Sequence, residues 1–162
     1  MLAIIGGSGM DQLPGLKLDE QQAVQTPYDT GAVVVQRGTL EGTSQSVVFL
    51  PRHGADHAVP PHRINYRANL FALHMLGVAG VLAVNAVGGL SAKMGPGVIA
   101  IPDQIIDYTW GREHTFFDGS SSAIESPDQF SATVAHIDFT EPYDAGLRQS
   151  LIDAAARQGI AV

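Results

Sequence analysis

Cysteine is missing from the 162 residues of this chain. Its absence excludes a disulfide framework and any chemistry that needs a thiolate. The chain also lacks an apolar run of transmembrane length. Its first residues lead straight into glycines, without the basic start and long apolar core of a signal peptide. We therefore expect a soluble, cytoplasmic protein that has no membrane partner.

Basic residues are scarce, because nine Lys and Arg stand against sixteen Asp and Glu, and the net charge is −7. This balance argues against nucleic acid as a partner but leaves room for a local cationic pocket. Hydrophobic residues make up 45% of the chain, which is typical of globular proteins. We expect a single domain over residues 1–162, long enough to bury a real core.

The first apolar run of the chain ends in a glycine turn. Leu2–Ile5 has the character of a buried strand, and the glycines that follow it flank Ser8. Backbone N–H groups in such a turn, together with the Ser8 hydroxyl, are suited to binding an anion. The default interpretation of the turn by itself is structural, since no helix follows to complete a dinucleotide-binding motif.

A second short apolar run, Val81–Val84, is followed by Asn85 and Ala86 and then by Gly88-Gly89. The run predicts a strand covered on both faces, as in a parallel sheet, and the glycines predict a sharp turn. Because ligands in open α/β sheets lie beyond the carboxyl ends of the strands, Asn85 and Ala86 are candidate binding residues. Taken alone, the stretch is better explained as an ordinary strand-to-loop turn.

A third strand end carries cationic side chains. Ala32–Gln36 and Val47–Leu50 predict paired strands, and Arg52, His53 and His57 follow the second of them. The planar fork of Arg donates two parallel hydrogen bonds to a phosphate, and His53 can add a donor. His57 is suited to contact a sugar or the reacting phosphate. The two histidines have a spacing that binds zinc on a helix, but the nearby prolines and glycine disfavour a helix, so we predict no metal.

The remaining elements are predicted from periodicity and capping residues. Asn65–Gly77 and Asp144–Gln158 have the apolar spacing and end signals of helices. Val98–Ile101 predicts a short strand, and Thr133–Ile137 a strand or an extended segment. The last residues, 160–162, resemble the opening of a further strand, so we expect the fold to continue beyond them.

Several short motifs stand in an order that is far more specific than any one of them. They are Ile4–Gly9, Thr26–Tyr28, Arg52–Gly54, Asn65–Asn69, Asn85–Gly89, Pro102–Gln104 with Ile106-Asp107, and Phe117–Gly119. The ordered set resembles the purine nucleoside phosphorylase family, in the branch that acts on methylthioadenosine and methylthioinosine. The resemblance covers essentially the whole chain.

The resemblance implies an α/β fold with a mixed, mostly parallel central sheet flanked by helices, with the carboxyl-terminal portion of the family fold absent. It implies a homotrimer that cleaves a 5'-methylthio purine nucleoside with inorganic phosphate, in purine salvage. The products would be the free purine and 5-methylthioribose 1-phosphate. Phosphate is then a co-substrate, and neither a metal nor an organic cofactor is implied.

The resemblance also assigns residues by position. The family's phosphate-binding places fall on Ser8, Arg52, His53, Asn85 and Ala86. His57 matches a histidine near phosphate and sugar, and His136 matches a residue that reaches a neighbouring subunit's site beside the 5'-substituent. The residues that recognise and protonate the purine belong to the portion that is absent here.

Three interpretations remain open. The stretch Asn85–Gly89 is nearer to that of 6-oxopurine enzymes, which favours S-methyl-5'-thioinosine as the substrate. The same chemistry on S-methyl-5'-thioadenosine is the alternative. The third interpretation belongs to another class, a truncated and inactive phosphorylase-like module that binds anions or partners.

Overall fold

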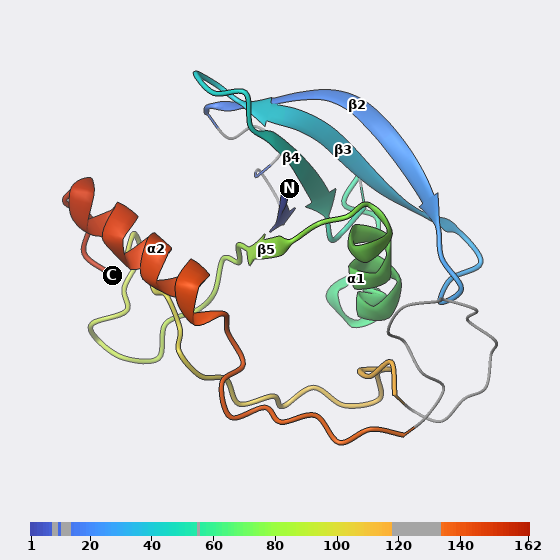
Figure 1. Cartoon of the computed structure of the whole chain (residues 1–162). Helices are drawn as coiled ribbons and strands as arrows, with labels where there is room; N and C mark the ends of the chain where they lie inside the picture. Colours follow the sequence, from blue (N-terminus) through green and yellow to red (C-terminus); the bar gives the residue numbers. More distant parts are fainter. Residues whose placement is uncertain (8–9, 11–13, 55, 118–133) are drawn as a thin grey trace. The chain divides into compact units, whose positions relative to one another are not determined.

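The computed structural model describes residues 1–162 except 8–9, 11–13, 55 and 118–133. The chain divides into two compact units, of which the first comprises Met1–Ala86 and Gly111–Val134 and the second comprises Val87–Trp110 and Ala135–Val162. Figure 1 follows the chain through both units. Among the described residues, no helix has the length and apolar character that crossing a membrane requires.

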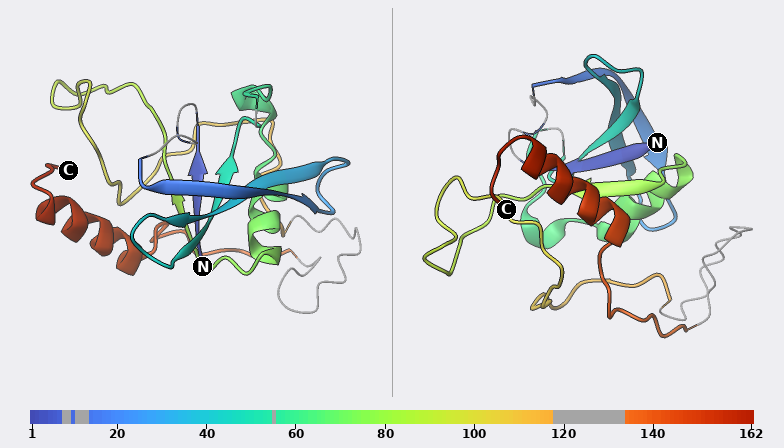
Figure 2. Two further views of the ribbon diagram at one scale, coloured as in Figure 1. Left: turned by 90° about the horizontal axis from the view of Figure 1, so that it is seen from above. Right: turned by 60° about the vertical axis from the view of Figure 1, so that its left-hand side comes forward.

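The first unit is built on a five-stranded sheet in the order β2-β3-β4-β1-β5. Its strands are β1 (Leu2–Gly6), β2 (Leu16–Gln25), β3 (Ala32–Leu40), β4 (Ser46–Pro51) and β5 (Gly80–Ala83). β1 pairs in parallel with β4 and β5, whereas β2–β3 and β3–β4 are antiparallel. The mixed sheet that the resemblance implies is confirmed, and its parallel part is β4-β1-β5 (Figures 1 and 2). Within the described residues, two of the four strand pairings are parallel and two are antiparallel.

The parallel pairing brings the carboxyl ends of β1, β4 and β5 to one edge of the sheet. Gly6, the last residue of β1, is in register with Pro51, the last residue of β4. Ile5 is in register with Ala83, the last residue of β5. The loops that leave these strands therefore begin side by side, as ligand sites in α/β sheets require.

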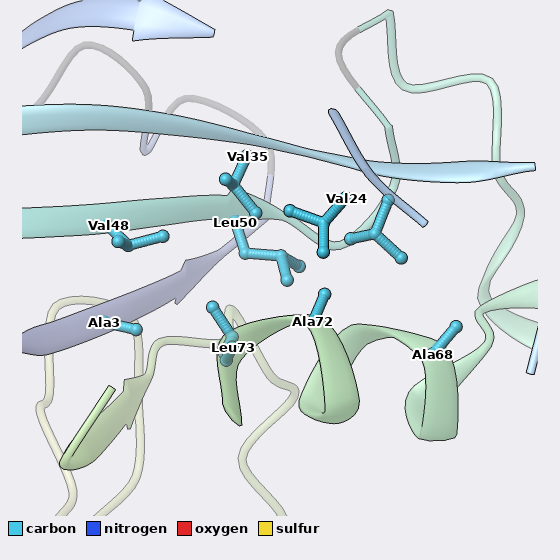
Figure 3. Packing of buried hydrophobic residues seen from close by; sticks show 9 residues of the cluster. Ala3, Val24, Val35, Val48, Leu50, Ala68, Ala72 and Leu73 are labelled. Atoms are coloured by element: carbon cyan, nitrogen blue, oxygen red, sulfur yellow. The ribbon is translucent and has the colours of Figure 1, made fainter. Parts of the chain in front are cut away.

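One helix of the first unit, α1 (Tyr66–Met75), covers one face of the sheet. Asn65 caps it, because its side chain accepts a hydrogen bond from the Ala68 N–H at 3.0 Å, and Gly77 follows it with a φ of 71°. Small alanines on its inner face let the backbone approach the strands closely. Figure 3 shows the resulting core, formed by Ala3, Val24, Val35, Val48, Leu50, Ala68, Ala72 and Leu73.

β2 is a strand that the sequence analysis missed. It lies at the edge of the sheet and carries mostly polar, exposed side chains, so it lacks an apolar run. The register with β3 also shifts between Leu18 and Glu20, which interrupts the apolar alternation that would have revealed a half-buried strand. Long edge strands of this kind are held by their partner more than by their own sequence pattern.

β5 confirms the predicted strand but corrects its environment. It is the outermost strand of the sheet, and Val81 and Leu82 are half-buried where the apolar run predicts cover on both faces. Within the described residues, β1 is the one strand that pairs with it. The apolar run indicates that β5 is suited to burial, and elements packed on both faces of the sheet would be needed to provide it.

The second unit contains α2 (Ala145–Arg157), which confirms the second predicted helix. The Asp144 side chain caps it by accepting from the Leu147 N–H at 2.7 Å, and Gly159 follows with a φ of 66°. Arg148 Nε donates to the Pro102 carbonyl at 3.1 Å. This contact joins the helix to the segment 98–106 of the same unit.

The predicted strand over Val98–Ile101 is wrong, because this segment has no strand structure and Val98 is 50% exposed. A strand needs a neighbour whose backbone completes its hydrogen bonds, and none of the described residues pairs with this segment. Residues 134–137, at the predicted Thr133–Ile137 segment, likewise have no regular structure, and residue 133 lies outside the described residues.

The close pairing of β2 with β3 requires glycine at position 38. A Cβ at Gly38, which is buried in β3, would overlap the carbonyl oxygen of Lys17 on β2. We expect Gly38→Ala to lower the free energy of unfolding by about 2 kcal/mol or more, because a strand backbone has to move. Gly31→Ala is the control, since its Cβ would lie 3.8 Å from Asp29 Oδ1 in ordinary contact. Urea unfolding of both variants measures the difference, and equal stabilities would contradict the prediction.

Candidate anion-binding site

Arg52 joins the three strand ends of the first unit. It follows β4 directly, and its backbone N–H donates to the Gly6 carbonyl at 3.1 Å. Its Nη1 donates to the Val84 carbonyl, just beyond β5, at 2.7 Å. The guanidinium therefore has a fixed position at the edge of the sheet, and a guanidinium has further N–H groups beyond the one used on Val84.

Gly7 leaves the space in which the Arg52 guanidinium lies. A Cβ built on Gly7 would stand 2.6 Å from Arg52 Nη2, closer than any real contact allows. Glycine at this position thus lets the turn after β1 and the Arg52 side chain approach each other. Gly7, which begins the turn that the sequence offered as a candidate anion-binding loop, therefore lies against the cation predicted at the end of β4.

His53 is oriented by the backbone of its own loop. Its Nδ1 lies 2.9 Å from the Val59 carbonyl oxygen. A carbonyl only accepts hydrogen bonds, so Nδ1 carries a proton and donates, which leaves Nε2 for other partners. The short 3₁₀ helix η2 (Pro61–Arg63) follows this loop and leads towards α1. Among the described residues from His53 to His57, none is helical, as the nearby prolines and glycine predicted.

His57 lies beside His53 with strained backbone geometry. The two rings are nearly parallel, at 19°, with their centroids 6.4 Å apart. His57 has a φ of 53°, in the left-handed region that residues other than glycine rarely adopt. Such a conformation costs on the order of 1–3 kcal/mol, and residues held in it cluster at active sites and ligand-binding sites.

A pocket opens at the carboxyl ends of β1 and β4. It brings together the glycine turn after β1, the loop after β4 and two side chains from the strands themselves. Its lining residues are Gly6, Gly7, Gln36, Phe49, Pro51, His53, Gly54 and His57. The sequence analysis named His53 and His57 for this site but missed Gln36, whose signal was a lone polar residue at the end of an otherwise apolar run, 32–36.

The other predicted residues of the first unit are only partly placed. Asn85 and Ala86 follow Val84, which holds Arg52, and both are exposed and lack regular structure. They therefore lie at the same end of the strands as the Arg52 guanidinium. Ser8 lies outside the described residues.

His136 belongs to the second unit, where it is exposed. Two residues later, Asp138 accepts hydrogen bonds from Thr140 Oγ1 at 2.6 Å and from the Thr140 N–H at 2.9 Å. These bonds, the side-chain one above all, hold the pKa of Asp138 below its usual range. The turn after His136 therefore carries an ionised carboxylate at neutral pH.

The family model of the phosphorylase superfamily matches residues 1–162 of this chain. The chain belongs to this superfamily. It is 44% identical to a probable S-methyl-5'-thioinosine phosphorylase of Pseudomonas syringae pv. tomato, over 98% of this chain and 60% of the relative. It is 48% identical to a probable 6-oxopurine nucleoside phosphorylase of Thermococcus kodakarensis, over 98% of this chain and 56% of the relative.

A solved structure agrees with this assignment. The methylthioadenosine phosphorylase from Schistosoma mansoni in complex with adenine matches with a TM-score of 0.81 and 36% identity, over 97% of this chain and 53% of that one. The α/β fold implied by the motifs is thereby confirmed. The chain spans between about half and three-fifths of the length of these relatives.

Proposed function

We propose that the full-length protein is a purine nucleoside phosphorylase that binds inorganic phosphate at the carboxyl ends of β1, β4 and β5. The observation that carries the proposal is the Arg52 guanidinium, which is held by Val84 and packed against Gly7 at the meeting point of the strand ends. Ser8, His53, Asn85 and Ala86 complete the proposed phosphate site. The match of the whole chain to the phosphorylase superfamily supports the same reading.

In this proposal the chemistry depends on position and charge. The glycosidic bond loosens first, and the sugar gains oxocarbenium character. A phosphate bound at Arg52 lies beneath C1' of the sugar, stabilises the positive charge and then forms the new C–O bond. The purine leaves with the electrons of the broken bond and takes up a proton. Holding the two reactants in line supplies most of the rate enhancement, and no covalent enzyme intermediate is needed.

We propose S-methyl-5'-thioinosine as the nucleoside. Relatives named as S-methyl-5'-thioinosine phosphorylases and as 6-oxopurine nucleoside phosphorylases, at 44% and 48% identity, support a 6-oxopurine base. S-methyl-5'-thioadenosine is the second candidate, supported by the structural match to a methylthioadenosine phosphorylase. His57 would contact the sugar or the phosphate, and His136 would act beside the 5'-substituent of a neighbouring subunit in a homotrimer.

We expect Arg52→Ala to lower kcat/KM for phosphorolysis by on the order of 100-fold, because a charge-assisted hydrogen-bonding group of the phosphate site is lost. Arg63→Ala is the matched control, since it removes the same charge from an exposed position in η2. Steady-state kinetics with varied phosphate compare the two variants in the full-length protein. Equal activity in both would show that Arg52 does not bind phosphate. Phosphate binding without turnover in the wild type would favour the inactive anion-binding module.

We expect His136→Ala and Arg52→Ala subunits to complement each other when they are mixed under conditions of proven subunit exchange. If His136 serves a neighbouring subunit's site, a mixed trimer contains a site in which both residues are intact. Activity should then rise above that of either variant alone. The control is each variant taken through the same exchange by itself, and absence of any gain would argue against a shared site.

We expect kcat/KM for S-methyl-5'-thioinosine to exceed that for S-methyl-5'-thioadenosine by at least about tenfold. A site that hydrogen-bonds a 6-oxo group leaves a buried polar group unpaired when a 6-amino group takes its place. Parallel assays of the two nucleosides at saturating phosphate test the preference. Equal or better use of the adenosine compound would replace the first candidate with the second.

A further inference from the structure

A phenylalanine of β4 is buried on the face of the sheet that α1 does not cover. Its neighbours Val48 and Leu50 belong to the core that packs against α1 (Figure 3). Side chains alternate along a strand, so Phe49 points to the opposite face. It is nevertheless only 1% exposed, and it is not part of the core that the described residues form against α1. The Phe49 ring is therefore buried by other neighbours.

The backbone at the start of the glycine turn after β1 is one of these neighbours. Phe49 is in register with Ile4 on β1, and Gly6, two residues further along β1, lies on the same face. A Cβ built on Gly6 would stand 2.6 Å from the Phe49 ring, closer than real contacts allow. Gly6, Gly7 and Phe49 also line the same pocket. The ring thus packs directly against the backbone from which the turn begins.

The next glycine of the turn is fitted to a second side chain from the end of β4. A Cβ built on Gly7 would stand 2.6 Å from Arg52 Nη2, and the Arg52 N–H donates to the Gly6 carbonyl at 3.1 Å. Phe49 and Arg52 are only three residues apart in the chain. Two consecutive glycines are therefore each held by a side chain of one short segment, the first by an aromatic ring and the second by a cation.

The position of the turn matters because hydrogen bonds to an anion weaken steeply as their distance and angle change. Phe49 has no polar side-chain atom, so it cannot bind the anion itself. Its buried ring has a fixed shape, and the surrounding atoms are close-packed against it. A smaller side chain at this position would leave a void, and the turn could move towards the sheet to fill it.

We propose that Phe49 is a positioning residue of the phosphate site. Its ring sets the position of the glycine turn and thereby holds the backbone N–H groups of the turn beside the Arg52 guanidinium. The inference rests on the proposed function, because it assigns a further residue to the same phosphate site. Phe49 touches neither phosphate nor nucleoside in this proposal and acts through Gly6 and Gly7.

Phe49→Leu in the full-length protein tests the proposal, because leucine is apolar but lacks the ring. Isothermal titration should show the Kd for inorganic phosphate raised roughly tenfold, which is about 1.4 kcal/mol. The KM for the nucleoside at saturating phosphate should change less than about twofold. Phe71→Leu is the matched control, since it makes the same change at a buried ring on α1. Both variants should have a lower melting temperature because each contains a cavity, but Phe71→Leu should leave the phosphate Kd unchanged.

Gly6→Ala tests the contact from the other side. The added methyl group enters the space of the Phe49 ring and should also raise the phosphate Kd. In Phe49→Leu with Gly6→Ala, the loss of affinity should be smaller than the sum of the two single losses, because leucine leaves room for the methyl group. A part of the loss should remain, since the same methyl group would lie 2.7 Å from the Met10 Cβ.

An unchanged phosphate Kd in Phe49→Leu would overturn the proposal, as would an equal rise in Phe71→Leu or single losses that simply add in the double variant. Failure of the proposed function is a separate result, namely a wild-type protein that binds phosphate but does not cleave nucleosides.

Discussion

The parallel pairing of β1 with both β4 and β5 is the constraint on which the site depends. Gly6 is in register with Pro51, and Ile5 is in register with Ala83. Because of this register, β1, β4 and β5 all end on the same side of the sheet. A shift of one residue would turn every side chain of a strand to the other face and separate the loops from one another. The core beneath, packed against α1, fixes that register by burying Ala3, Val48 and Leu50 on one side.

Arg52 has two functions in this arrangement that support each other. Its hydrogen bond to the Val84 carbonyl ties the end of β5 to the end of β4. The same bond fixes a long side chain that would otherwise lose conformational freedom when it bound an anion. A guanidinium can do both because its planar fork has donors on more than one edge, whereas an ammonium would be a point charge without that directionality. Structural anchoring of Arg52 is therefore compatible with the proposed phosphate role.

Sequence reasoning succeeded where a local pattern and the tertiary structure agree. The helix that begins at Asn65, the cap Asp144 of the second helix, and the strand ends before Arg52 and Asn85 were visible in the sequence, because each depends on neighbouring residues. It failed where a partner decides the outcome. β2 is a strand because β3 pairs with it, and Val98–Ile101 lacks strand structure because nothing among the described residues does. The apolar pattern of a segment indicates which side chains it can bury. Pairing with a neighbouring strand determines whether the segment becomes a strand.

The site shows the same division between local and distant information. Arg52 and His53 were recognisable because cations follow a strand end, but the hydrogen bond that sets the His53 tautomer comes from Val59 through the loop geometry. Gln36 was hidden because it reaches the pocket from within a strand, at the end of an otherwise apolar run, and no neighbouring residue in the sequence signals that position. A pocket is assembled by residues that are distant in the sequence, so a lone polar residue gains its place only from the pairing of its strand with the next.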